Sequence, residues 1–219
     1  MTLSHSQAKR FYDRFGSKQD KQSFYEDKAL DELIAHADFA QAHNVFELGC
    51  GTGRFALRLL NTQLPADASY LGIDLSDTMI ALAQRRLTPY AERASVIHSS
   101  GELYFPLEDQ SVDRVIATYV FDLLSDTDIR QAIAESRRVL TPTGKICLAS
   151  LSTGVSVASR FVCRVWSGLF RWNASLVGGC RPICLLDYFD PAYWSVNHHH
   201  VLTQFGVPSE ILIATPVHA

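Results

Sequence analysis

The residues best suited to chemistry form a short loop with three glycines spaced two apart, Gly49, Gly51 and Gly53. An apolar run containing the acidic residue Glu47 precedes this loop, and a helical pattern follows it. Glycines remove the Cβ atoms that would block close approach, and they allow the positive φ angles of a sharp strand-to-helix turn. The sequence therefore predicts a loop whose backbone lies against a nucleotide-like ligand.

The glycine spacing argues against two other nucleotide-binding loops. Dinucleotide folds of the nicotinamide type use Gly-x-Gly-x-x-Gly, whereas Gly53 is followed here by Arg54 and Phe55. Phosphate-binding loops need Gly-Lys-Ser or Gly-Lys-Thr, whose side chains hold the terminal phosphate and its metal, and neither follows.

The run from Glu47 to Gly53 resembles the first motif of class I S-adenosylmethionine-dependent methyltransferases. Three later segments agree with that family in order and spacing. Residues 70–76 resemble a second strand ending in an acidic residue, residues 111–118 the fourth strand, and residues 138–145 the turn into the fifth strand. One glycine loop is a weak signal, but four ordered landmarks across residues 40–152 strongly favour this family.

The resemblance implies an α/β fold: a doubly wound, seven-stranded, mostly parallel sheet with an antiparallel last strand and helices on both faces. The alternation of helix and strand patterns agrees with it. We expect a single methyltransferase domain over residues 1–219. Residues 1–40 would form N-terminal cap helices, 41–152 the cofactor-binding core, and 153–219 a substrate-side helix, a loop and closing strands.

Local signals predict where several elements begin and end. A capping-box pattern at 23–26 predicts a helix start, Ser76 should cap a helix that ends before Pro89, and another helix should follow Ser125. A helix is also expected over 155–172. The fifth strand is expected over 145–151, and a closing hairpin over 200–214 with its turn at 206–209.

The resemblance implies S-adenosyl-L-methionine as cofactor and S-adenosyl-L-homocysteine as product. Glu47 is expected near the amino acid end of the cofactor. Asp74 should accept hydrogen bonds from both ribose hydroxyls, because two carboxylate oxygens match a vicinal diol, although it is also a possible helix N-cap. Leu75 or Met79 would pack against adenine or belong to the ordinary core. The expected cofactor-binding residues are Glu47, Gly49, Cys50, Gly51, Gly53, Asp74, Leu75, Met79, Ser100, Gly101 and Thr118.

Adenine recognition departs from the family pattern. Many relatives place an aspartate after the third strand to accept the adenine amino group, whereas this chain has His-Ser-Ser-Gly-Glu at 98–102. Ser99, Ser100 and Glu102 remain alternative substitutes for it.

The catalytic candidates are Tyr119, Asp122 and Tyr12. A sulfonium carries its own leaving group, so methyl transfer is an in-line displacement that mainly needs alignment and exclusion of water. Tyr12 is expected in a lid over the cofactor, or else as a surface aromatic residue. Tyr119 would contact cofactor or substrate, and Asp122 is either a base or a helix cap. The sequence supplies no unambiguous general base.

Composition narrows the class of molecule that can accept the methyl group. A net charge of −3 gives no basic footprint for nucleic acid, and no Asn-Pro-Pro-Tyr or Asp-Pro-Pro-Tyr run follows the fourth strand. A small-molecule acceptor is therefore expected. Aromatic and aliphatic residues dominate the last third, which indicates an apolar or aromatic acceptor, unless these residues merely build the core.

The cysteines, the histidines and the apolar runs indicate in which compartment the protein lies and whether it binds a metal. Five scattered cysteines without Cys-x-x-Cys indicate reduced thiols in a cytoplasmic protein, and no run is long enough to span a bilayer. A basic stripe on the 155–172 helix is either a solvated edge or a peripheral membrane contact. No metal is expected: on an extended segment at most two of His198, His199 and His200 converge on one ion.

Three functions therefore stand side by side. The favoured one is a small-molecule methyltransferase. The second is a catalytically silent module of the same fold that binds cofactor or a protein, and the third is a nicotinamide-dependent oxidoreductase. Cofactor binding and methyl turnover would distinguish them.

Overall fold

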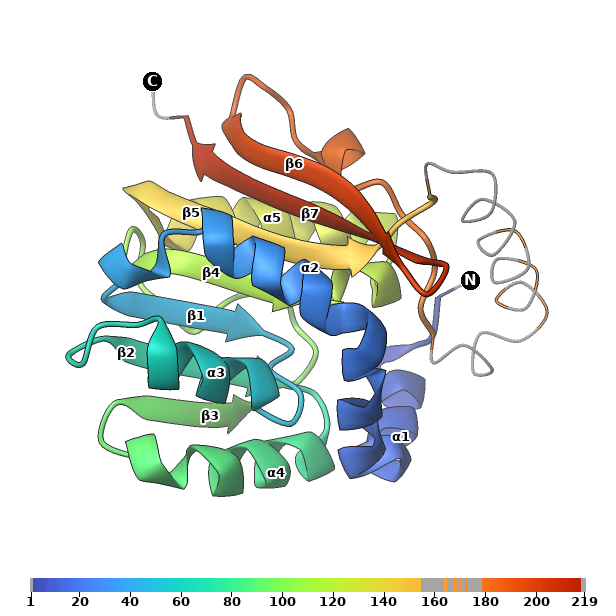
Figure 1. The fold of residues 1–219 in the computed structure, drawn as a ribbon, viewed down its shortest axis with the longest axis horizontal. Coiled ribbons are helices and arrows are strands. Elements are labelled where there is room, and N and C mark those ends of the chain that lie inside the picture. The colour runs from blue at the N-terminus through green and yellow to red at the C-terminus, as the bar shows by residue number, and fades with distance from the viewer. Residues whose placement is uncertain are drawn as a thin grey trace.

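The computed structural model describes residues 2–154 and 179–217, together with residues 164, 168, 170 and 172. Its strands form one seven-stranded sheet with the order β3-β2-β1-β4-β5-β7-β6 (Figure 1). The strands are β1 (Asn44–Leu48), β2 (Ser69–Asp74), β3 (Ala94–His98), β4 (Val112–Thr118), β5 (Leu140–Leu151), β6 (Trp194–Gln204) and β7 (Val207–Pro216). The predicted helix at 155–172 and its basic stripe lie almost wholly outside the described residues.

The sheet is parallel except at one strand. Strands β1 to β5 pair in parallel, whereas β7 runs antiparallel to both β5 and β6. The predicted fold class, including the antiparallel last strand, is confirmed. In such a sheet ligands bind outside the carboxyl ends of the strands, near the point where the strand order reverses. Here the strand order reverses between β1 and β4, which lie side by side in the sheet.

Helices cover both faces of the sheet (Figure 1). On one face α2 (Ser23–His36), α3 (Arg54–Thr62) and α4 (Asp77–Leu87) pack on residues such as Val45 and Ile116. On the other, α5 (Asp126–Val139) and the 3-10 helix η6 (Leu185–Tyr188) pack on residues such as Phe46 and Leu148. Val45 and Phe46 point to opposite faces because side chains alternate along a strand, so each apolar strand supplies both cores.

Two helix starts occur where the sequence places them. Ser76 caps α4 by accepting a hydrogen bond from the Met79 backbone, and Ser125 caps α5 through Asp128. The helix α4 ends at Leu87, before Pro89. These caps satisfy backbone N–H groups that have no partner within the helix, which explains why local sequence predicts them.

The N-terminal segment contributes a helix at the carboxyl edge of the sheet and a helix of the core. Helix α1 (His5–Phe15) lies across the carboxyl edge of the sheet, and η1 (Gly16–Gln22) leads directly into α2 (Figure 1). The buried Arg114 of β4 donates to the carbonyls of Ala37 and Asp38, which fixes the end of α2 on the sheet. The remaining short 3-10 helices are η2 (Phe39–Gln41), η3 (Thr88–Tyr90) and η4 (Phe121–Leu123).

Two local predictions need correction. The hairpin turn is Phe205–Gly206 rather than 206–209, since both residues have positive φ and β7 already begins at Val207. The fifth strand begins at Leu140, with a register irregularity before Lys145. A third helix start, predicted at 23–26, is confirmed: α2 begins at Ser23, directly after η1, and the Glu26 carboxylate lies near Arg54.

Candidate active site

The glycine loop between β1 and α3 has the conformation that the sequence predicts. Gly49, Gly51 and Gly53 all have positive φ, at 70°, 53° and 73°. A Cβ on Gly49 would lie 2.4 Å from Cγ2 of Val120, and one on Gly51 would lie 3.1 Å from the Gln19 amide. Other residue types are therefore excluded at Gly49 by both conformation and space.

Asp74, at the carboxyl end of β2, fixes this loop. Its Oδ2 accepts from the Gly51 backbone (2.9 Å) and its Oδ1 from the Ser76 backbone (2.8 Å). Burial raises the pKa of Asp74, and the hydrogen bonds from Ser76 and Gly51 partly oppose that shift. Each oxygen keeps a further lone pair. The carboxylate can therefore still accept hydrogen bonds from the two hydroxyls of a diol bound in the cavity that Asp74 lines.

Glu47, near the end of β1, is almost fully buried beneath the loop. Tyr70 donates a hydrogen bond to its Oε2 over 2.6 Å. Burial raises the pKa of Glu47 to about 7; the Tyr70 hydrogen bond opposes this shift and the charge of Asp74 adds to it. A buried carboxyl with its pKa near neutrality is a typical feature of a binding or catalytic site.

Residues of the N-terminal segment that the sequence argument did not select close over the loop. Thr52 donates to Asp20 (2.6 Å), and Arg86 binds both the Asp20 carboxylate (2.7 Å) and the Thr52 carbonyl (3.0 Å). Glu26 lies near Arg54 and is mostly buried; burial raises its pKa to about 7, although the Arg54 charge opposes this. Gln19 covers Gly51, and its Oε1 is buried without a hydrogen-bond partner among the described residues.

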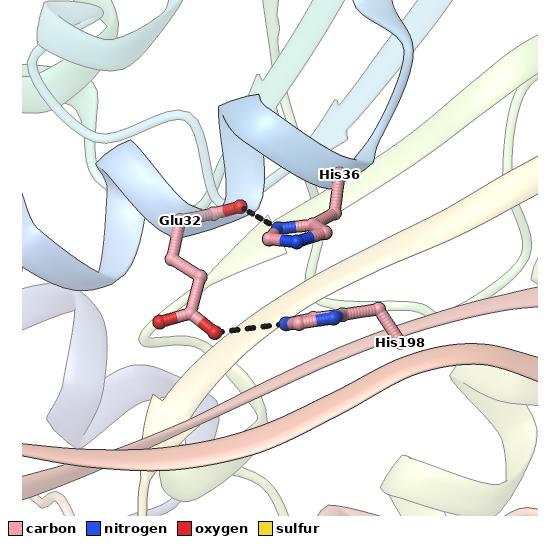
Figure 2. A group of neighbouring side chains, drawn as sticks. All are labelled: Glu32, His36 and His198. Atoms are coloured by element: carbon pink, nitrogen blue, oxygen red, sulfur yellow. Dashed lines mark hydrogen bonds and ion pairs between the residues drawn. The ribbon is translucent and has the colours of Figure 1, made fainter.

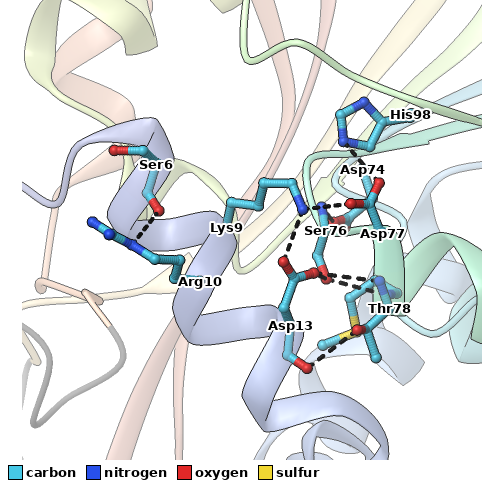
Figure 3. A network of polar contacts seen from close by, with 10 residues as sticks. Ser6, Lys9, Arg10, Asp13, Asp74, Ser76, Asp77, Thr78 and His98 are labelled. Atoms are coloured by element: carbon cyan, nitrogen blue, oxygen red, sulfur yellow. Dashed lines mark hydrogen bonds and ion pairs between the residues drawn. The ribbon is translucent and has the colours of Figure 1, made fainter.

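Helix α1 is fastened to the start of α4 by polar contacts (Figure 3). Asp13 Oδ1 accepts from Ser76 Oγ (2.7 Å) and from the Thr78 backbone (3.3 Å), while Lys9 joins Asp13 (2.8 Å) to Asp77 (2.6 Å). Burial would raise the pKa of Asp13, but the hydrogen bonds from Lys9, Ser76 and Thr78 lower it below the usual value. These contacts form a latch that holds α1 over the carboxyl edge of the sheet.

Two adjoining cavities lie beneath α1 and the glycine loop. The larger, about 130 Å³, is lined by Asp74, Leu75, Ser99, Gly101 and Tyr12 among others. The smaller, about 40 Å³, is lined by Glu47, Cys50, Gly51 and Glu26 among others. Gly49, Thr118, Tyr119 and Gln19 line both. Both cavities are smaller than the roughly 300–1,000 Å³ of typical ligand pockets, and α1 and Gln19 form part of the wall that encloses them.

The structure places some of the expected site residues at the two cavities and others away from them. Most of the expected cofactor-binding residues line one of the two cavities, whereas Gly53, Met79 and Ser100 line neither. Met79 is fully buried, and Ser100 is exposed. Of the alternatives for adenine, Ser99 lines the larger cavity, while Glu102 is exposed and does not.

The catalytic candidates have different surroundings. Tyr119 follows β4 with a φ of 55°, and its hydroxyl lies 2.7 Å from Ser209 Oγ. Burial raises the pKa values of Tyr12 and Tyr119, so both phenols stay protonated and act as hydrogen-bond donors. Asp122 is buried close to Ser150 and lines neither cavity; burial raises its pKa to about 6. The positive φ of Tyr119 is the kind of backbone strain that gathers at functional sites.

The electrostatics of the site favour a cationic ligand. Four carboxyl groups line the cavities, from Asp20, Glu26, Glu47 and Asp74, and Arg54 is the one Arg or Lys among the described lining residues. Arg54 is itself paired with Glu26 and with Asp27. In a poorly hydrated cavity a cation stabilises the ionised form of these carboxyl groups, and an anionic diphosphate opposes it.

Comparison with known proteins agrees with this chemistry. Residues 45–144 match the model of a methyltransferase domain family. The chain is 29% identical over 143 residues to a ubiquinone/menaquinone biosynthesis C-methyltransferase, UbiE, of Geobacter sulfurreducens; the match covers 64% of this chain and 53% of that protein. It is 31% identical over 163 residues to a malonyl-(acyl-carrier protein) O-methyltransferase of a Marinomonas species, over 74% and 56% of the two chains. The chain thus spans about half the length of these curated relatives.

Among solved structures, the 4+2 cyclase SpnF superimposes with a TM-score of 0.75 and 16% identity, over 99% of this chain and 98% of that one. That likeness shows the fold, which is the Rossmann-like fold of the methyltransferases. The chain belongs to the class I S-adenosylmethionine-dependent methyltransferases, whose cofactor is S-adenosylmethionine. Among the described residues, no helix combines the length and the apolar character needed to cross a membrane.

Proposed function

We propose that the protein binds S-adenosylmethionine at the glycine loop and transfers its methyl group to a small apolar or aromatic acceptor. The observation that carries this proposal is the excess of carboxyl groups that line the two cavities, because S-adenosylmethionine brings a sulfonium and an ammonium to cavities lined by a single arginine, which is already paired. The relatives named as a ubiquinone/menaquinone biosynthesis C-methyltransferase and as a malonyl-(acyl-carrier protein) O-methyltransferase support a carbon or oxygen nucleophile in the acceptor.

The residues present fit the cofactor. Asp74 would hold the ribose hydroxyls, and Glu47 would face the ammonium together with the carbonyl groups of the loop. Ser99 and Leu103, with Leu75, would enclose the adenine. Gln19 Oε1, which is buried and unpaired among the described residues, supplies an acceptor for a donor on the ligand. When bound, the cofactor supplies a methyl group already activated for displacement.

The chain itself then has to position the acceptor and exclude water. Apolar residues of the larger cavity, Leu3, Val120, Leu123 and Leu124, form a wall for an apolar acceptor beside Tyr12 and Tyr119. The two phenols remain protonated, so they orient an acceptor oxygen by donating hydrogen bonds. Closure of α1 through Asp13 excludes water and sets the near-attack geometry on which such displacements depend.

A second candidate is a catalytically silent module that binds the cofactor without transfer. The position of Asp122 favours this alternative, since the carboxyl group expected to act as a base lines neither cavity and no phenol is ionised near neutral pH. An acceptor that needs no base, such as an already acidic enol or phenol, is compatible with the first candidate.

Calorimetric titration with S-adenosylmethionine, S-adenosylhomocysteine and NADH tests the cofactor assignment without knowledge of the acceptor. Micromolar binding of both sulfur compounds without binding of NADH supports the proposal, and the reverse pattern overturns it. A second step uses methyl-labelled cofactor with a panel of phenols, quinols and acyl thioesters. Labelled product establishes transfer, whereas tight binding with no product across the panel favours the silent module.

A further inference from the structure

Two histidines at the edge of the sheet face the same side of β6. His198 and His200 are two residues apart on this strand, pairing with Ile213 and Ile211 of β7. Their side chains therefore point to the face covered by α2, while His199 points to the other face and contacts Glu210 (2.8 Å). Helix α2 brings Glu32 and His36, one turn apart, to the same place.

The side chains from the two elements meet closely (Figure 2). His198 Nε2 lies 2.8 Å from Glu32 Oε1, and His200 Nδ1 lies 2.7 Å from the same oxygen. The His36 ring stacks on the His198 ring, with centroids 3.8 Å apart and planes 13° apart. Ligand atoms of Glu32, His36 and His198 all lie within 4.8 Å of one another. A tetrahedral zinc site with bonds of about 2.0–2.1 Å places its ligand atoms roughly 3.4 Å apart. Because a metal lies in the plane of each imidazole that binds it, one of the two stacked rings must turn about its side-chain bonds for both to bind.

The hydrogen bonds also leave the groups in suitable chemical forms. His36 Nδ1 donates to the Glu32 backbone carbonyl (2.9 Å), which leaves Nε2 as the nitrogen with a free lone pair. This is the contact by which a second group orients a metal-binding imidazole.

We propose that Glu32, His36 and His198 form a binding site for a divalent transition-metal ion, with zinc as the best match. Two imidazoles and one carboxylate are ligands that zinc prefers, and the fourth position is left to water or to His200, which lies beside the same Glu32 oxygen. The side chains of Glu32 and His198 are 18% and 20% exposed, so an ion can enter from solvent without the chain unfolding. The ion would replace the protons now shared between imidazole and carboxylate.

Such an ion would clamp α2 to the edge strand β6. Glu32 and His36 lie in the second half of α2, and its first half carries Tyr25 and Glu26, which contact the active-site residues Tyr119 and Arg54. The metal would thus fix the helix that forms one wall of the cavity. The same four side chains without an ion make a hydrogen-bonded clamp, so the test must measure metal binding itself.

The experiment titrates Co²⁺ and then Zn²⁺ into chelator-treated protein that carries no histidine tag. We expect one equivalent of Co²⁺ to give the intense visible bands of a four-coordinate ion, without the thiolate charge-transfer band that cysteine ligands produce, and Zn²⁺ to displace it. Calorimetry should give an affinity for Zn²⁺ in the micromolar range or tighter. Absence of one-to-one binding, or a six-coordinate spectrum, overturns the proposal.

Substitutions then locate the ion. His198→Gln and His36→Gln should each weaken Zn²⁺ binding at least about tenfold, since even loss of a group that only supports a ligand costs that much. His199→Gln is the matched control, because it lies within the same run of histidines but faces the other side, and it should bind as the wild type does. Circular dichroism checks that the variants fold. Equal Zn²⁺ binding by folded His198→Gln and wild type refutes the site.

Discussion

Replacement of Glu47 by glutamine should stabilise the protein and weaken cofactor binding at the same time. Glutamine keeps an oxygen that can accept the Tyr70 hydrogen bond but removes the ionisable carboxyl. The two effects have different physical origins, and each has a magnitude that follows from the structure.

The stability effect follows from the raised pKa of Glu47. The carboxyl has a pKa of about 7 in the folded protein and about 4.5 in the unfolded chain. Between these values the unfolded chain releases a proton that the folded protein retains, so the stability present below pH 4.5 is lost as the pH rises through 7. A difference of about 2.5 pKa units corresponds to about 3 kcal/mol. Glu47→Gln should therefore have a free energy of unfolding up to about 3 kcal/mol above wild type at pH 8, with little difference near pH 4.5.

The binding effect has the opposite sign. Loss of a charge-assisted hydrogen bond to the cofactor ammonium should cost about 1.5–3 kcal/mol, or about 10- to 150-fold in affinity. In the wild type only the ionised carboxyl favours the cation. Its population rises from about one tenth at pH 6 to about nine tenths at pH 8, so affinity should rise about tenfold across that interval. The variant should lose this contribution and keep only the part that comes from Glu26, which lines the same cavity and whose pKa burial also raises to about 7.

Urea denaturation at pH 5 and pH 8 measures the first effect, and calorimetric titration with S-adenosylmethionine from pH 6 to pH 8 the second. Glu92→Gln, at an exposed glutamate away from the site, is the control and should change neither. A Glu47→Gln protein less stable than wild type at pH 8 would show that burial of the Glu47 charge costs no stability, and hence that its pKa is not raised. Equal affinity of variant and wild type would remove Glu47 from the cofactor site.

Three further predictions concern the loop and the lid. Asp74→Ala should weaken S-adenosylmethionine binding by about 1.5–3 kcal/mol in calorimetry, and unchanged affinity contradicts the ribose assignment. Asp13→Ala removes the hydrogen bonds that hold α1 to Ser76 and Thr78, which should cost about 1 kcal/mol by analogy with helix caps. Stopped-flow measurements should then show cofactor release about fivefold faster. An unchanged release rate would mean that α1 does not control cofactor release. Gly49→Ala should lower the free energy of unfolding by about 2–4 kcal/mol in urea denaturation. Adding Val120→Ala should recover only the part of this loss that comes from the clash with Val120, because the φ of 70° stays unfavourable for alanine. Full recovery would show that backbone strain is negligible.

Sequence alone determined the parts of this protein that depend on near neighbours. The glycine loop, the caps at Ser76 and Ser125, and the alternation of buried residues along the strands follow from backbone sterics and from hydrogen bonds within a few residues. These local rules, with the resemblance to a family, gave the sheet and the cofactor loop. They failed at the final hairpin, where positive φ at Phe205 is a conformation that few residues other than glycine adopt.

Only the tertiary structure decided what covers the site and what gathers beside it. Gln19 and Glu26 reach the glycine loop because η1 and α2 fold back over it, and no local pattern predicts that either residue lies there. Tertiary packing also places Ser99 at the larger cavity and leaves Ser100 and Glu102 outside it. The sequence correctly limited His198–His200 to two converging side chains, but their partners Glu32 and His36 come from a helix more than 160 residues earlier. Such meetings depend on how whole elements pack, which spacing along the chain does not encode.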